Sequence, residues 1–193
     1  MTADLTTPDF FKNAKSMSLE DMVKAAPDGG LYMEFGVHTG GTIARIANST
    51  TSKVYGFDSF KGLPEFWGDE GLAAGTFACD IPKELPTNVE LVVGWYNDTL
   101  PTFVKENKDT PISFIHIDCD LYSSTKCIFD NFENNFRVGS VIAFDEIVYP
   151  QRAAWAAEEH KAFEEFLLRT RYTCEVLGKQ IFNGVGFYLT EKN

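Results

Sequence analysis

Short apolar runs alternate along this chain with longer segments of helical periodicity. The runs are rich in valine, isoleucine and phenylalanine and end at glycine, proline or acidic residues, a pattern typical of buried strands. Strands are expected at residues 31–36, 53–58, 88–94, 111–118, 140–145, 172–178 and 184–190. Helices are expected at residues 18–26, 40–49, 98–107, 121–135 and 152–170.

The order of these elements predicts the class of fold. Five strand–helix alternations indicate an α/β protein with a mostly parallel sheet and helices on both faces. The last two strands are separated by only 5 residues, a link that permits a hairpin and makes the last strand antiparallel. The pattern therefore predicts a seven-stranded sheet in a single domain over residues 1–193, with an N-terminal helical segment at 1–28.

One connection is much longer than the others. Residues 59–87 are punctuated by glycine and proline and contain Phe66 and Trp67. Loops of this length inside a compact domain are usually functional or mobile. The segment is therefore a candidate lid over a site, although the two aromatic residues are equally suited to pinning the loop to the domain.

Four carboxylates stand where two apolar runs end. Asp118 and Asp120 follow one run, and Asp145 and Glu146 follow the next. Open α/β sheets bind ligands at the carboxyl ends of their strands, and clustered carboxylates are costly unless a cation, a proton or a donor offsets them. A metal site is therefore expected, with strand-end helix capping as the alternative. Asp120 lies directly before a helix and is interpreted as its N-cap.

A glycine-rich turn connects the first strand to the next helix. Gly36, Gly40 and Gly41 permit close approach of a ligand to the backbone and to the helix start. Their spacing is not that of the dinucleotide fingerprint. Asp58 ends the second strand, where an acid is placed to accept hydrogen bonds from ribose hydroxyls. Glu34 lies within the first strand and needs a donor, such as a ligand amine or hydroxyl.

The charge and cysteine content of the chain limit the classes of partner that it can bind. The net charge of −11 argues against nucleic acid and against an anionic membrane surface, both of which need a basic face. The four cysteines form no CxxC pair, so neither a zinc ribbon nor a redox motif is indicated. Neither a signal peptide nor a membrane-spanning run is visible. A cytoplasmic location with reduced thiols is the default expectation.

Several of these segments together resemble a known family. The succession EFGVHTGGT, GFDSFKGLP, VVGWYNDTLP, HIDCDLYSST and FDE resembles class I S-adenosylmethionine (SAM)-dependent methyltransferases, which have a Rossmann-like fold. The chain is most similar to the macrocin O-methyltransferase family, whose members methylate sugar hydroxyls. The resemblance covers roughly residues 30–150 in the right order.

The resemblance implies a cofactor site and a metal site. The methionine part of SAM would be held by Gly36, Val37, Gly40, Gly41 and Thr42. Asp58 would bind the ribose. Ser59 and Phe60 would lie beside the adenine, and Gly94 and Trp95 would close the adenine pocket. Mg²⁺ would be bound by Asp118, Asp145 and Glu146. The family usually has aspartate where Glu146 stands, so the third ligand departs from the pattern.

These residues predict a SAM-dependent, Mg²⁺-assisted O-methyltransferase acting on a hydroxyl of a small acceptor such as a sugar or glycoside. Asp118 is the candidate general base, because it would contact both metal and acceptor. Three alternatives stay open: a catechol-like phenol O-methyltransferase, a nicotinamide-dependent oxidoreductase and a non-catalytic SAM-binding module. No nucleic acid or membrane partner is expected, and a homo-oligomer is compatible with the family.

Several buried polar residues are harder to assign. Glu159 falls on the apolar face of the last long helix, so it or His160 is a candidate to line the acceptor pocket; a salt bridge to Arg152 is the alternative. Trp155 is suited to forming a wall of that pocket or packing in the core. His116 is expected to bond inside the protein, and Cys119 to be a small buried residue.

Overall fold

A computed structural model describes residues 14–68, 71–145, 147, 155–180 and 184–192. Its centre is a seven-stranded sheet in the order β3-β2-β1-β4-β5-β7-β6. The strands are β1 (Leu31–Phe35), β2 (Val54–Asp58), β3 (Val89–Val93), β4 (Ile112–Ile117), β5 (Val141–Phe144), β6 (Tyr172–Lys179) and β7 (Val185–Lys192). Strands β1 to β5 run parallel, and β7 is antiparallel to both neighbours. The predicted fold class is confirmed.

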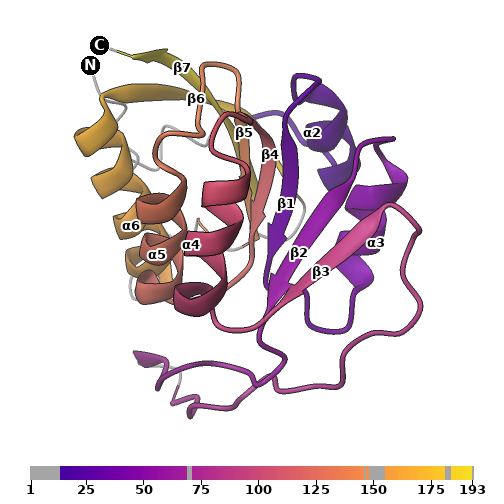
Figure 1. The fold of residues 1–193 in the computed structure, drawn as a ribbon. Helices are drawn as coiled ribbons and strands as arrows, with labels where there is room; N and C mark the ends of the chain where they lie inside the picture. The colour runs from indigo at the N-terminus through magenta and orange to yellow at the C-terminus, as the bar shows by residue number, and fades with distance from the viewer. Residues whose placement is uncertain (1–13, 69–70, 146, 148–154, 181–183, 193) are drawn as a thin grey trace.

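Helices cover both faces of the sheet (Figure 1). Helices α4 (Tyr96–Glu106), α5 (Tyr122–Phe132) and α6 (Trp155–Thr170) lie on one face, and α2 (Leu19–Ala25) and α3 (Gly41–Asn48) lie on the other. Ser18 caps α2, because its hydroxyl accepts the Asp21 N–H at 3.1 Å. None of the described helices is both long and apolar enough to cross a membrane.

The core between the sheet and α4–α6 is built largely from phenylalanine. Phe35 and Phe57 stack with ring centroids 4.5 Å apart, and Phe129 stacks on Phe166 at the same separation. All four rings are buried, and burying such a side chain contributes about 1.5–3 kcal/mol. This core fixes α5 and α6 against each other and against the strands whose ends carry the acidic residues.

The described parts of the long connection, residues 59–68 and 71–87, pass below the carboxyl edge of the sheet and then return along its side to the start of β3 (Figure 1). Trp67 is buried against Leu63 and Leu121, whereas Phe66 is 62% exposed. Glu65 accepts a hydrogen bond from the Ser123 hydroxyl at the start of α5. The loop is therefore attached to the domain through Trp67 and Glu65, and the predicted anchoring role holds for Trp67 but not for Phe66.

Candidate functional site

A cavity of about 880 Å³ opens at the carboxyl ends of β1, β2, β3 and β4. The strand order changes direction between β1 and β4, since β2 and β3 are added on one side of β1 and β4 and β5 on the other, and open α/β sheets bind ligands at such a switch point. Strand-end residues Gly36, Asp58, Gly94 and Asp118 line one side of the cavity. Loop residues Leu63, Trp67, Leu72 and Phe77 line another, and α5 adds Ser123, Ser124 and Cys127.

Asp58 holds the turn between β1 and α3. Its Oδ2 accepts the N–H groups of Val37 at 2.9 Å and His38 at 2.8 Å, and its Oδ1 accepts the Phe60 N–H at 2.7 Å. A carboxylate offers about four lone pairs, so acceptor capacity remains toward the cavity that Asp58 lines. The predicted binding residue is thus also a structural link between two loops.

Gly36 brings the turn after β1 against the loop after β4. Its φ is +95°, and a Cβ atom there would lie 1.8 Å from the carbonyl oxygen of Asp118. The Asp118 N–H in turn donates to the Phe35 carbonyl at 2.9 Å. No residue with a side chain fits at Gly36, because both the backbone angle and the close contact exclude a Cβ.

Acidic groups converge beside this turn. Asp118 and Asp120 both line the cavity, and Asp145 follows β5, with its N–H bonded to the Ile117 carbonyl at 3.0 Å. Burial, reinforced by Asp145 and Asp120, raises the pKa of Asp118 to about 8. Burial and Asp145 raise the pKa of Asp120 to about 6. The carboxylates repel one another, so the site favours a cation or a bound proton.

The structure corrects the expectation for Asp120. The N-cap residue of α5 is Leu121, which makes no side-chain cap bond. Asp120 has a φ of +64° and lines the cavity instead. The cap is supplied from elsewhere: Glu158 of α6 accepts the Tyr122 N–H at 2.8 Å, a contact between distant residues that the local sequence pattern does not reveal.

The predicted metal ligands are described only in part. Asp118 and Asp145 influence each other electrostatically, and their carboxylate oxygens are the hard donors that Mg²⁺ prefers. Glu146 lies outside the described residues. Within the described ranges, no group of three or more His, Cys, Asp or Glu side chains is arranged to hold a metal ion. The donor chemistry fits Mg²⁺, and the three-ligand set stays a prediction.

Glu34 finds its donor inside the protein. Its Oε1 lies 3.1 Å from Nδ1 of His116 on the neighbouring strand, and both side chains are fully buried. Burial raises the pKa of Glu34. Burial alone would lower the pKa of His116, but the contact with Glu34 outweighs it and raises that pKa. The pair therefore retains a proton, and the expectation that His116 bonds inside the protein is confirmed.

The other predicted cofactor residues divide into two groups. Ser59, Gly94 and Trp95 line the cavity. The other predicted residues do not line the cavity. Val37 and Phe60 are buried in the core, and Gly40 packs against Pro82 and Leu85. Gly41 and Thr42 are the first two residues of α3. Contact of this second group and of Glu34 with a cofactor stays a prediction.

Several cavity residues were not identified from the sequence. His38, Tyr96, Asn97 and Cys127 line the cavity, and the Cys127 thiol donates to Asn97 Oδ1 at 3.1 Å. The proximity of Asn97 on α4 to Cys127 on α5 follows from helix packing, which no local pattern encodes.

The sequence did mark Glu159 as a candidate site residue, because it lies on an apolar helix face. It does not line the cavity, but accepts backbone N–H bonds behind it. The side chain of Trp155 lies outside the described part of the chain.

Comparison with known proteins agrees with this geometry. A family model described as a methyltransferase domain matches residues 33–147. Among solved structures, the calicheamicin methyltransferase CalS11 is 24% identical, with a TM-score of 0.66 over 87% of this chain and 74% of that one. The O-methyltransferase NovP is 22% identical, with a TM-score of 0.64 over 89% and 78%.

A more distant match has ligands in its crystal structure. MycE, a methyltransferase of the mycinamycin biosynthetic pathway in complex with Mg and SAH, is 10% identical, with a TM-score of 0.55 over 90% of this chain and 48% of that one. No curated protein sequence matches the chain. These structures share the fold with this chain.

Proposed function

Since this chain belongs to the methyltransferase domain family, we propose that it transfers a methyl group from SAM to a hydroxyl of a small acceptor such as a sugar or glycoside. One observation carries the proposal. Gly36 of the first turn, Asp58, Asp118 and Asp120 all line a single cavity at the switch point of the sheet. A cofactor and an acceptor bound there would meet at the acidic groups.

The residues suggest how SAM would lie. The free acceptor capacity of Asp58 suits the ribose hydroxyls, and the methionine part would lie beside Gly36, which lines the same cavity. Trp95, Gly94 and Ser59 line the adjacent part of the cavity and suit the adenine ring, because aromatic rings favour stacking with flat partners. This placement extends from β3 across β2 to β1 and ends near Asp118.

Methyl transfer to an alcohol requires the acceptor oxygen to lose its proton. Asp118 is our candidate base, since it lines the cavity at the end of β4. Asp120 lines the same wall two residues later and offers a second carboxylate within the site. A positioned base typically contributes about 10²–10⁴-fold in rate. Leu63, Trp67 and Leu72 would exclude water from this side of the cavity.

We further propose that Mg²⁺ assists the reaction, held by Asp118 and Asp145 together with Glu146. The ion would lower the pKa of an acceptor hydroxyl and orient it. Support comes from the mutual repulsion of the carboxylates and from the presence of Mg in the MycE complex. Support for a sugar acceptor comes from another structure of CalS11, described as a TDP-rhamnose 3'-O-methyltransferase.

Calorimetry and an acceptor screen test the proposal. The protein should bind SAM and SAH more tightly than NAD, and it should methylate members of a panel of sugars, glycosides and phenols. Tight NAD binding without SAM binding would overturn the methyltransferase proposal. Turnover confined to catechols would replace the sugar acceptor by a phenol, and SAM binding without any turnover would favour a non-catalytic module.

The residue roles need a separate experiment. Asp118→Asn should abolish turnover while SAM binding is preserved, because the base acts on the acceptor and not on the cofactor. Activity should fall with EDTA and return with Mg²⁺. Full activity of Asp118→Asn would remove this residue from the role of base, and full activity in EDTA would remove the metal.

A further inference from the structure

Two adjacent glutamates of α6 accept hydrogen bonds from the loop that follows β4. Glu159 Oε1 accepts the N–H groups of Cys119 at 3.3 Å and Asp120 at 3.1 Å. Glu158 Oε2 accepts the Tyr122 N–H at 2.8 Å. Glu159 is only 3% exposed, so its bonds form in a protected environment, where they are stronger than in water.

The loop needs acceptors from outside because of its own conformation. Asp120 has a φ of +64°, a region that side-chain-bearing residues seldom adopt. Leu121 offers α5 no side-chain cap, and the first N–H groups of a helix have no partner within it. A carboxylate at this end also interacts favourably with the helix dipole. The two glutamates therefore stabilise the conformation in which Asp118 and Asp120 face the cavity.

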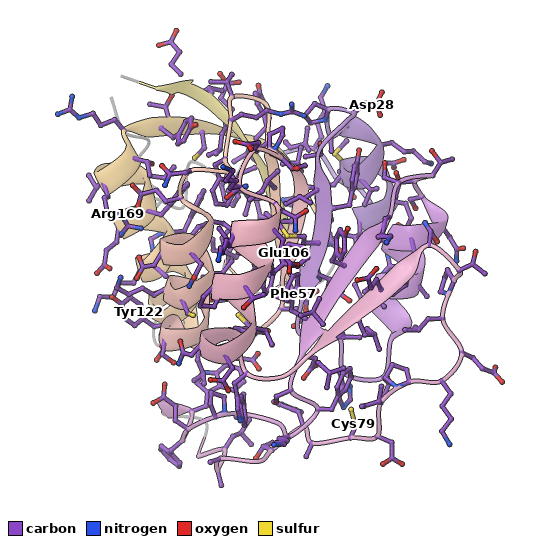
Figure 2. The ribbon with its side chains drawn as sticks, in the orientation of Figure 1. Asp28, Phe57, Cys79, Glu106, Tyr122 and Arg169 are labelled. Atoms are coloured by element: carbon purple, nitrogen blue, oxygen red, sulfur yellow. The ribbon has the colours of Figure 1, made fainter. Side chains whose placement is uncertain are left out.

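Helix α6 is itself held firmly. Phe163 and Phe166, on the same buried face as Glu159, stack on Phe129 of α5 with centroid separations of 5.8 and 4.5 Å. Figure 2 shows Tyr122 at the start of α5 beside α6, where its hydroxyl donates to Glu165 at 2.8 Å. A rigid second element is what keeps a site residue within the narrow geometry that catalysis requires.

We propose that Glu159, assisted by Glu158, is a positioning residue that sets the direction of the Asp118 and Asp120 carboxylates in the cavity. The inference rests on the proposed O-methyl transfer, in which those carboxylates act on the acceptor. Glu159 touches neither cofactor nor acceptor in this scheme. It acts by holding the N–H groups of two successive peptides, Asp118–Cys119 and Cys119–Asp120, and a displacement of about 1 Å at a reacting group can cost about 10²-fold in rate.

Glu159→Gln in the full chain tests this role. The amide keeps the size of the side chain but replaces the charged acceptor with a weaker neutral one. We expect kcat to fall about 10- to 100-fold, with the KM for SAM changed less than about twofold, since Asp58 and the glycine turn are untouched. Amide hydrogen exchange, measured by NMR, should become faster at Cys119 and Asp120 in the same variant.

Glu165→Gln is the matched control, because it makes the same change from a charged to a neutral acceptor at the Tyr122 hydroxyl and leaves the loop amides paired. Its kcat and loop exchange should equal those of the unmodified protein. Unchanged exchange in Glu159→Gln, or faster exchange with an unchanged kcat, would overturn the proposal. If Glu159→Gln fails to fold, kcat and amide hydrogen exchange are measured for Glu158→Gln instead, with exchange followed at the Tyr122 amide. The same criteria apply.

Failure of the proposed function gives a different result. If the unmodified protein methylates no acceptor, O-methyl transfer is wrong, whereas the exchange experiment still reports whether Glu159 controls the loop. If the unmodified protein turns over and Glu159→Gln does so equally well, only the positioning role is lost.

Discussion

The carboxylate of Asp58 lies against the backbone of His38, whose N–H it accepts at 2.8 Å. His38 has a φ of 48°, so the turn depends on this contact to keep a side-chain-bearing residue in a left-handed conformation. The residue expected to bind the ribose of SAM therefore also shapes the turn expected to bind its methionine part. Substitutions at Asp58 should affect folding and cofactor binding together.

Asp58→Asn should weaken SAM binding at least about tenfold and lower the free energy of unfolding by about 2 kcal/mol. The variant has one carbonyl oxygen for the three N–H groups that Asp58 accepts. Calorimetry and urea denaturation measure the two effects. Asp109→Asn, at an exposed site far from the cavity, should change neither, and an unaltered stability in Asp58→Asn would contradict the structural role.

The glycines of the first turn should differ sharply in tolerance. Gly36→Ala would place a Cβ 1.8 Å from the Asp118 carbonyl oxygen at a φ of +95°, so we expect a loss of about 2–4 kcal/mol in unfolding free energy. A Cβ at Gly41 meets nothing within 4 Å, and alanine favours a helix by about 0.8–1 kcal/mol over glycine. Gly41→Ala should therefore fold normally.

Chemical denaturation of both variants checks this contrast, and SAM titration of Gly41→Ala adds a second result. A folded Gly41→Ala protein with weakened SAM binding would support the predicted cofactor contact at Gly41. A stable Gly36→Ala protein would show that the β1 turn and the β4 loop are less closely packed than described.

The acidic cluster predicts a pH dependence of stability. The pKa values of Asp118 and Asp120, about 8 and about 6, lie above the ordinary aspartate value, so the folded state binds more protons than the unfolded state. The unfolding free energy of the metal-free protein should therefore fall as pH rises from about 4 to 8. Mg²⁺ should raise the melting temperature more at the upper end of this range.

Thermal unfolding in EDTA and in Mg²⁺ across that range measures the effect. The double variant Asp118→Asn, Asp120→Asn should show a flatter pH profile and a smaller response to Mg²⁺. An equal Mg²⁺ response at both ends of the range would argue against these carboxylates as the binding site.

The buried pair of Glu34 and His116 predicts a pronounced non-additivity. His116→Phe leaves the Glu34 carboxyl group without its partner, which should cost about 3–5 kcal/mol. Replacing both residues, as Glu34→Leu with His116→Phe, should cost less than the sum of the single changes, because the stranded group is then absent. Urea denaturation of the four proteins completes the cycle, and strict additivity would show that the two groups do not interact.

The fold followed from local patterns because each strand is a short apolar run with clear ends. Strand β4 was expected at 111–118 and lies at Ile112–Ile117, and the five-residue link correctly indicated the antiparallel β7. Helix ends were less accurate: α4 begins at Tyr96, two residues before the expected start, and contains Pro101 within its first turns. Pro101 is the sixth residue of this helix and has no N–H to donate to the Asn97 carbonyl.

Within the site, residues at strand ends were predictable and residues brought in by packing were not. Asp58, Gly36 and Asp118 stand at the ends of strands, so the order of the sheet alone places them together. Glu159 reaches the site through the packing of α6 on α5, and His116 reaches Glu34 only because β1 and β4 are neighbours. For Asp120, the sequence offered a local cap, whereas a glutamate 38 residues later, Glu158, performs that task.

The contact between Gly36 and the Asp118 carbonyl group has a wider consequence for how such a site can change. The two loops are separated by no side chain, so their spacing is set by the thickness of the polypeptide backbone itself. New acceptors can be accommodated by altering the loop at 59–87 or the surface of α5, which border the cavity at a distance from this contact. The region where the methyl donor is expected to meet Asp118 has no such freedom, and inherited variation should accumulate around it while the contact itself is kept.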